Sequence, residues 1–364
     1  MRTIEEIRQL KEYYVNDLFL DVRSEQETDR QYIDDTFDVP EIKDPHKILR
    51  SGIGYEAVSA PAEQIITSNP QVFFHRKGDK DLIGKLSLLV NNIWIPTIKR
   101  SVPNLFKEVV KNKLSRGESY IRLVHNETWV TGERRKTGLP VLFLCPDPMC
   151  VYGSPEEDDC GWLPNVGVPN EVIVFFERQP SEVMTKYPNW GNPKGRKLVK
   201  ENPDEKRELV EWWEYWSKDQ KYFEADGQGV LKEGIQPNIY GFTPFVRKYS
   251  GFGKRSPSGE LSDLIVSDIR QSRDLIKEEC SIRSDISSIL HIFSHKPVTV
   301  IIPAGEEIDI EGLKRGFDMG AYRINVLPLP SGSEIKWGET ILPSPEVFQH
   351  LRDIRAEIRE RHPF

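Results

Sequence analysis

The most constraining feature of the 364-residue sequence is a long amphipathic stretch between Gly259 and Ile292. Its apolar residues recur three or four positions apart, which predicts a helix with one apolar side. These residues are Leu261, Ile265, Ile269, Ile276, Cys280, Ile286, Leu290 and Phe293. If the helix is unbroken, it is about 50 Å long at about 1.5 Å per residue. That length exceeds what a single globular core needs.

Strand-forming residues follow this helix. Pro297 prevents the helix from continuing, and the β-branched run at 298–302 predicts a strand. A short helix near 310–317 and a second strand near 323–329 complete a small β-α-β piece. We expect such a short piece to be unstable when isolated.

A second helix is predicted after this small piece. Ser344 can cap it, Pro345 suits its first position, and Glu346 suits its first turn. Its apolar residues form a narrow seam suited to packing on another helix, and they are Val347, Leu351, Ile354 and Ile358. The sequence therefore predicts a small tip between an outgoing and a returning helical rod.

The remainder of the chain has a helical part and a β-rich part, so we predict the α+β fold class. Helical periodicity dominates residues 1–118, whereas short segments rich in Val, Ile and aromatic residues dominate 119–256. The predicted parts are thus 1–118, 119–256, a long helix at 257–293, a small α/β piece at 294–341 and a second helix at 342–364.

Charge and hydropathy restrict the possible functions. The formal net charge is -7, whereas tight binding along a nucleic-acid backbone requires a strongly basic face. Weak or sliding contact with DNA remains compatible with this charge.

No apolar run approaches the roughly 18 residues that cross a bilayer, so we expect no membrane contact. The first residues lack the apolar core of a signal peptide, so we expect the protein to stay in the cytoplasm where it is made.

Candidate metal ligands are few, and each has a simpler interpretation. Cys145, Cys150 and Cys160 lack the usual spacing of a zinc site and a fourth ligand, so free thiols are the simpler interpretation. His291 and His295 lie four residues apart and could share a metal, although the end of a helix also attracts imidazolium. We therefore expect no metal and no other cofactor.

Two further stretches allow a functional and a structural interpretation. The acidic run at 155–159 could hold divalent cations for phosphodiester hydrolysis, but consecutive acids more often form an exposed turn. The aromatic residues Trp212, Trp213, Tyr215 and Trp216 could stack on bases, but one strand with an aromatic inner face is the more usual structure. No catalytic signature is found, which favours a non-enzymatic protein.

The series of helix, strand, helix, strand and helix from 259 to 361 resembles the stem, clip and stem of tailed-bacteriophage portal proteins. RGESYIRLVHNE, followed by LPVLFLCPDPMCVYG, resembles the portal wing, in which a helix ends at Gly and strands lead into a Pro-containing turn. ELVEWWEYWSKDQKYFEADGQGV and YGFTPFVRKYSGFG resemble the paired wing strands and the entry to the stem. The likeness covers nearly the whole chain, but its motifs are patterns of elements rather than catalytic residues.

The resemblance implies a homo-oligomeric ring, a dodecamer, at one vertex of a viral capsid, assembled in the host cytoplasm. Double-stranded DNA passes through the central tunnel of such a ring without sequence specificity. The implied protein partners are the large terminase subunit, the head-tail adaptor, and the major capsid and scaffolding proteins. Residues 1–256 then correspond to the wing, 294–341 to the clip, and 342–364 to a second stem helix that stops before the tunnel loop and crown of portal proteins.

A ring requires each rod to present surface to its neighbours. The predicted interface consists of Ile269, Ile276, Cys280, Ile286, Leu290, Leu351, Ile354 and Ile358. The predicted tunnel cations are Arg270, Arg273, Lys277 and Arg283, for which ion pairing on the helix surface is the structural alternative.

Two other functions stay open at this stage. One is a metal-dependent hydrolase or nuclease that uses the acidic run at 155–159. The other is a scaffolding or adaptor protein that binds partner helices with its long helix.

Overall fold

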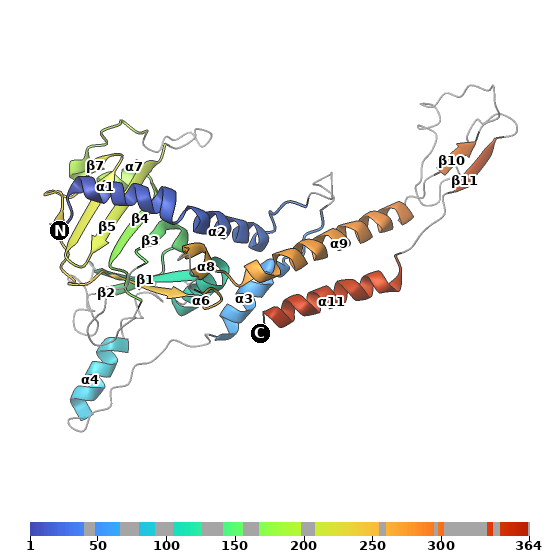
Figure 1. The fold of residues 1–364 in the computed structure, drawn as a ribbon, viewed down its shortest axis with the longest axis horizontal. Coiled ribbons are helices and arrows are strands. Elements are labelled where there is room, and N and C mark those ends of the chain that lie inside the picture. Colours follow the sequence, from blue (N-terminus) through green and yellow to red (C-terminus); the bar gives the residue numbers. More distant parts are fainter. Residues whose placement is uncertain are drawn as a thin grey trace. The chain divides into compact units, whose positions relative to one another are not determined.

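The computed structural model confirms the α+β class, with helices and antiparallel sheets (Figure 1). It describes residues 1–39, 48–65, 80–91, 105–125, 141–155, 167–197, 208–254, 260–294, 298–301, 333–337 and 343–362. The chain divides into two compact units. Unit 1 comprises Met1–Phe37, Gly52–Arg273 and His362–Phe364, and unit 2 comprises Asp38–Ser51 and Asp274–Arg361.

Unit 1 contains an antiparallel sheet whose two faces are both buried. Its strands are β3 (Val151–Gly153), β4 (Glu171–Arg178), β5 (Val210–Ser217), β6 (Gln220–Ala225) and β7 (Gln228–Gly229), in that order, with β8 (Gln236–Pro237) also paired to β6. Trp212 and Trp216 of β5 belong to one core cluster, whereas Trp213 and Tyr215 belong to another. All four are at most 7% exposed, so they do not form a platform for stacking bases.

Helices cover one face of this sheet. They are α1 (Ile4–Tyr13), a π-helical turn (Tyr14–Leu18) and α2 (Leu20–Ile33), and their residues Ile7, Tyr14, Phe19 and Val22 share a core with Trp213 and Tyr215. The start of α1 is fixed locally, because Thr3 and Glu6 form a capping box.

A second antiparallel sheet in unit 1 has the order β2-β1-β9. Its strands are β2 (Val141–Leu144), β1 (Glu118–His125) and β9 (Phe245–Tyr249). The other helices of unit 1 are α3 (Ile53–Ile65), α4 (Lys80–Asn91), α6 (Leu105–Arg116), α7 (Pro180–Lys186), α8 (Leu261–Leu264) and the 3-10 turns Pro148–Cys150, Pro188–Trp190 and η8 (Ile269–Ser272). None of the helices within the described ranges is long and apolar enough to cross a bilayer.

The predicted unbroken helix between Gly259 and Ile292 is wrong. The chain forms α8, then leaves helical geometry at Ile265, forms η8, and only then begins α9 (Arg273–Ser294). Contacts with distant parts of unit 1 cause the break. The Asp268 N–H donates to the carbonyl of Leu114, and the Ser250 hydroxyl donates to the carbonyl of Val266. At 22 residues, α9 is about 33 Å long rather than about 50 Å.

The described part of unit 2 includes α9, an antiparallel pair of strands and a second helix (Figure 1). The strands are β10 (Val298–Ile301) and β11 (Glu334–Trp337), and the helix is α11 (Pro345–Arg361). The predicted strand at 298–302 and the predicted helix start at Pro345 are confirmed. The predicted helix at 310–317 and strand at 323–329 lie outside the described residues. The strand β11 was not predicted.

Gly117 allows the close approach that breaks the long helix. Its φ is +80°, and a Cβ at this position would lie 2.7 Å from backbone atoms of Val266. We expect Gly117→Ala to lower the free energy of unfolding by about 2–4 kcal/mol, because it adds a backbone clash to left-handed strain. Urea unfolding would measure the loss. Gly227→Ala is the control, because Gly227 has a φ of +84° and nothing within 4 Å of its added Cβ. It should cost about 1–2 kcal/mol, and equal losses in both variants would contradict the role of close approach.

Candidate functional site

The helices α9 and α11 form an antiparallel pair, as Figure 1 shows. Ion pairs between described residues join them. Nε of Arg355 donates to Oε1 of Glu279 at 2.8 Å, and Nη2 lies 2.7 Å from the same oxygen. Nε2 of His350 lies 3.1 Å from Oε1 of Glu278. Glu279 is fully buried, whereas Glu278 and His350 are about half exposed. The first pair is therefore the stronger link, because a surface pair in water contributes little.

Apolar side chains lie along both helices. Ile276, Cys280 and Ile286 of α9 are buried, and so are Ile354 and Ile358 of α11. A short segment of the chain also binds α9. The Leu49 N–H donates to Oγ of Ser284 at 2.9 Å, and Sγ of Cys280 lies 3.4 Å from the Leu49 carbonyl. The apolar stripe of α9 is thus covered, at least in part, by the chain's own atoms.

The predicted subunit interface falls into two groups. Six residues are buried within the single chain, and they are Ile269, Ile276, Cys280, Ile286, Ile354 and Ile358. Leu351 is half-buried and Leu290 is 43% exposed. Sequence periodicity cannot distinguish an apolar stripe covered by the same chain from one covered by a second copy, so the interface assignment stays a prediction. The exposed side chains Ile289 and Phe348 were not predicted.

Two of the four predicted tunnel cations lie in an ionic cluster of unit 1. Arg273 donates from Nε to Oδ1 of Asp29 and from Nη1 to Oε2 of Glu25, both at 2.8 Å. Nε of Arg270 lies 3.4 Å from Oε2 of Glu25. Burial of the Asp29 carboxyl raises its pKa, while the charge of Arg273 opposes this shift. Glu25 and Asp29 lie four residues apart and therefore share one face of α2. This i, i+4 spacing of two acids is the feature of the sequence that could have identified them as partners for a cation.

The other two predicted tunnel cations lie on α9. Arg283 is 3.7 Å from Glu279, and Lys277 is half-buried. Arg270, Arg273 and Arg283 thus form ion pairs within the chain. Their role toward DNA stays a prediction.

A chain of hydrogen bonds joins an acid, an imidazole and a hydroxyl in unit 1. Nδ1 of His362 lies 2.6 Å from Oδ2 of Asp268, and Nε2 lies 2.9 Å from Oγ of Ser272. This order of groups is also that of a hydrolytic triad. However, His362 is 2% and Ser272 0% exposed, so no substrate can reach the hydroxyl in this conformation. The arrangement instead fixes His362, the residue that follows α11. Sequence reasoning missed it because His362 lies 94 residues from Asp268 and 90 residues from Ser272.

The structure describes only part of the candidate metal ligands. Cys160, His295 and the acids of the run at 155–159 lie outside the described residues. Burial raises the pKa of the Cys145 thiol to about 12 and also raises that of Cys150. Among the described residues, no group of three or more His, Cys, Asp or Glu side chains could hold a metal ion.

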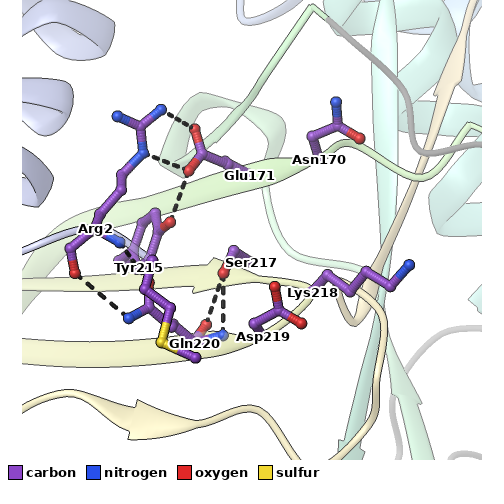
Figure 2. Close-up of a pocket in the computed structure, with 9 residues that line it drawn as sticks. Arg2, Asn170, Glu171, Tyr215, Ser217, Lys218, Asp219 and Gln220 are labelled. Carbon is purple, nitrogen blue, oxygen red and sulfur yellow. Dashed lines mark hydrogen bonds and ion pairs between the residues drawn. The ribbon is translucent and has the colours of Figure 1, made fainter.

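A polar hollow of about 390 Å³ lies where the N-terminus meets the large sheet (Figure 2). Its lining consists of Met1, Arg2, Asn170, Glu171, Tyr215, Ser217, Lys218, Asp219 and Gln220. Figure 2 shows that several of these groups bind one another. Arg2 donates to both carboxylate oxygens of Glu171, and the Tyr215 hydroxyl donates to Oε1 of Glu171 at 2.7 Å. These bonds fasten the N-terminus to the sheet.

Comparisons with solved structures find likenesses at low sequence identity. No protein-family model and no curated protein matches the chain. The chain is similar to one from the neck of a native GTA particle computed with C12 symmetry, with 11% identity and a TM-score of 0.41 over 85% of this chain and 63% of the other. It is also similar to one from the neck of an empty GTA particle computed with C6 symmetry, with 11% identity and a TM-score of 0.43 over 85% and 65%. The chain spans less than two thirds of both, and likenesses at these TM-scores carry no argument about function.

We expect the buried ion pairs of Arg273 to be important for stability. Arg273→Met leaves the carboxylate of Asp29, which is 0% exposed, without its closest cation. The free energy of unfolding should fall by about 3–5 kcal/mol, the usual cost of removing one partner of a buried pair. Arg30→Met on α2, the helix that also contains Asp29, is the control, because Arg30 forms pairs on the surface. It should lower the free energy of unfolding far less, because a surface pair in water contributes little. Urea unfolding followed by circular dichroism compares them, and similar losses would contradict this account.

Proposed function

We propose that this chain is a subunit of a bacteriophage portal: a homo-oligomeric ring, dodecameric by analogy, at the capsid vertex of the virion. In this proposal the ring is a conduit for double-stranded DNA during packaging and ejection. It is also the docking site for the large terminase subunit and the head-tail adaptor, and it contacts the major capsid and scaffolding proteins. The support is the resemblance of the sequence to portal proteins together with the geometry of unit 2.

The observation that carries the proposal is the order and direction of the elements in unit 2. The chain leaves along α9, forms strands β10 and β11, and returns along α11, which lies antiparallel to α9 and is ion-paired to it. This is the order of a stem helix, a clip and a second stem helix. In the proposal, 257–293 and 342–364 are stem, 294–341 is clip, and 1–256 is wing with a helical part (1–118) and a β-rich part (119–256).

The charge of the chain is compatible with a conduit. DNA slides only where the protein neutralises few phosphates, because strong counterion release holds the duplex in place. The net charge is -7, and the proposed tunnel cations Arg270, Arg273 and Arg283 already have carboxylate partners. Together with Lys277 they would therefore give only weak contacts to passing DNA. The proposed role is structural and non-enzymatic.

Imaging and mass measurement test the proposal. Mass photometry of the purified protein should show particles near twelve times the chain mass of 42.1 kDa, and negative-stain images should show rings with a central channel. A monomer at every concentration would contradict the proposal. A monomer or dimer whose α9 amides become protected from hydrogen exchange only when a partner is added would instead favour an adaptor or scaffolding protein.

A further inference from the structure

The pair formed by α9 and α11 has two distinct broad faces. Each residue of a helix is rotated by about 100° from the previous one, so Glu278 and Glu279 point to different sides of α9. The partners His350 and Arg355 are five residues apart and likewise diverge around α11 by about 140°. The pair Glu278–His350 therefore borders one face of the two-helix layer, and the pair Glu279–Arg355 borders the other.

The face that contains Glu278 is acidic. Asp274, Glu278, Ser281 and Asp285 occupy positions i, i+4, i+7 and i+11 of α9 and thus form one stripe. The three carboxylate residues are exposed. Asp274 and Asp285 form no hydrogen bond or ion pair within the part of the chain that the structure describes. On α11 the same face carries Asp353 and Glu357, which lie three and seven residues after His350.

The face that contains Arg355 is basic. Phe348, Arg352, Arg355 and Arg359 occupy the same positions, i, i+4, i+7 and i+11, of α11. Arg352 and Arg359 are exposed, and Phe348 is 39% exposed. Arg352 has no ion pair with any described residue. Leu290 of α9 lies in line with Glu279 on this face, eleven residues later, and is 43% exposed.

The two faces match in spacing as well as in charge. Glu278 and Asp285 are seven residues apart, and so are Arg352 and Arg359. Seven residues of helix span about 10 Å, so two carboxylates of one copy can meet two guanidinium groups of another at the same time. Each face would repel a second copy of itself, because like charges would lie opposite each other.

We propose that the acidic face of one copy of this chain docks on the basic face of the next copy. The contact is heterologous, because it joins different faces of identical chains, and a repeated heterologous contact forms a ring when its rotation closes. Phe348 and Leu290 add apolar area to it, while the charges set its orientation. The inference rests on the proposed ring function and names the surfaces that build the ring.

A mixing experiment with two charge-reversed variants tests this contact. E278K/D285K reverses the charge of the two α9 positions that would meet Arg352 and Arg359, and R352E/R359E reverses the charge of the two α11 positions that would meet Glu278 and Asp285. Alone, each variant should assemble at least about 100-fold more weakly than the unmodified protein, because like charges then meet at every contact. An equimolar mixture should assemble again to within about tenfold, because the two variants can alternate around the ring. Sedimentation velocity measures assembly, and circular dichroism checks that each variant keeps its helices.

Matched controls separate this contact from a general effect of charge. D219K/E233K and K218E/K232E make the same changes of charge at exposed positions of unit 1 and should leave assembly within about threefold. Raising the salt from about 0.05 M to about 0.5 M should weaken assembly of the unmodified protein, because salt screens exposed charges.

The outcomes distinguish the inference from the proposed function. An unmodified protein that is monomeric at all concentrations contradicts the ring and, with it, this contact. An unmodified protein that forms rings while the reversed variants do so equally well contradicts the contact alone. Loss of assembly in both variants without recovery in the mixture contradicts the head-to-tail arrangement. If R352E/R359E loses binding to a short DNA duplex but still assembles, the basic face binds nucleic acid and the inference is overturned.

Discussion

The buried carboxylate of Glu279 is the contact on which the arrangement of unit 2 depends. It is fully buried, and its Oε1 accepts a hydrogen bond from Nε of Arg355 across the helix pair, with Nη2 of the same guanidinium 2.7 Å away. Arg283 lies 3.7 Å away on the same helix as Glu279. A buried charge is costly unless it is paired, so α11 is favoured in the register that brings Arg355 to Glu279. That register decides which residues of both helices share a face. The opposite charges of the two faces, and hence the proposed contact between copies, follow from it.

Local signals in the sequence predicted those parts of the fold that have local causes. The start of α11 follows from Pro345 and its flanking residues, and the strand at 298–301 follows from a β-branched run. The break at Ile265, inside the stretch predicted as one long helix, has a different cause. There the backbone binds α6 and the end of β9, and Gly117 makes the approach possible. Val266, Ser267 and Asp268 favour caps and strands rather than helix interiors, but only the tertiary contacts show that this weak preference prevails.

The candidate site could be predicted only in part for a similar reason. Periodicity identified the apolar residues of α9 and α11 but not what covers them, and six of the eight are buried by the single chain. The acidic stripe of α9 that begins at Asp274 and the basic stripe of α11 that contains Arg352 can be recognised in the sequence, because their residues lie three or four positions apart. Their placement on opposite faces needs the two ion pairs between the helices, which join residues more than 70 positions apart. His362, Asp268 and Ser272 were missed for the same reason.

A double-mutant cycle between Glu279 and Arg355 tests the register of the helix pair most directly. Glu279→Gln, Arg355→Met and the double variant would be compared by urea unfolding at a concentration that keeps the protein dissociated. The account predicts a coupling free energy of about 2 kcal/mol or more, because both groups depend on each other in a buried site. The same cycle for the exposed pair of Glu278 and His350 should give less than about 0.5 kcal/mol. A coupling near zero for Glu279 and Arg355 would contradict the register, and with it the two charged faces.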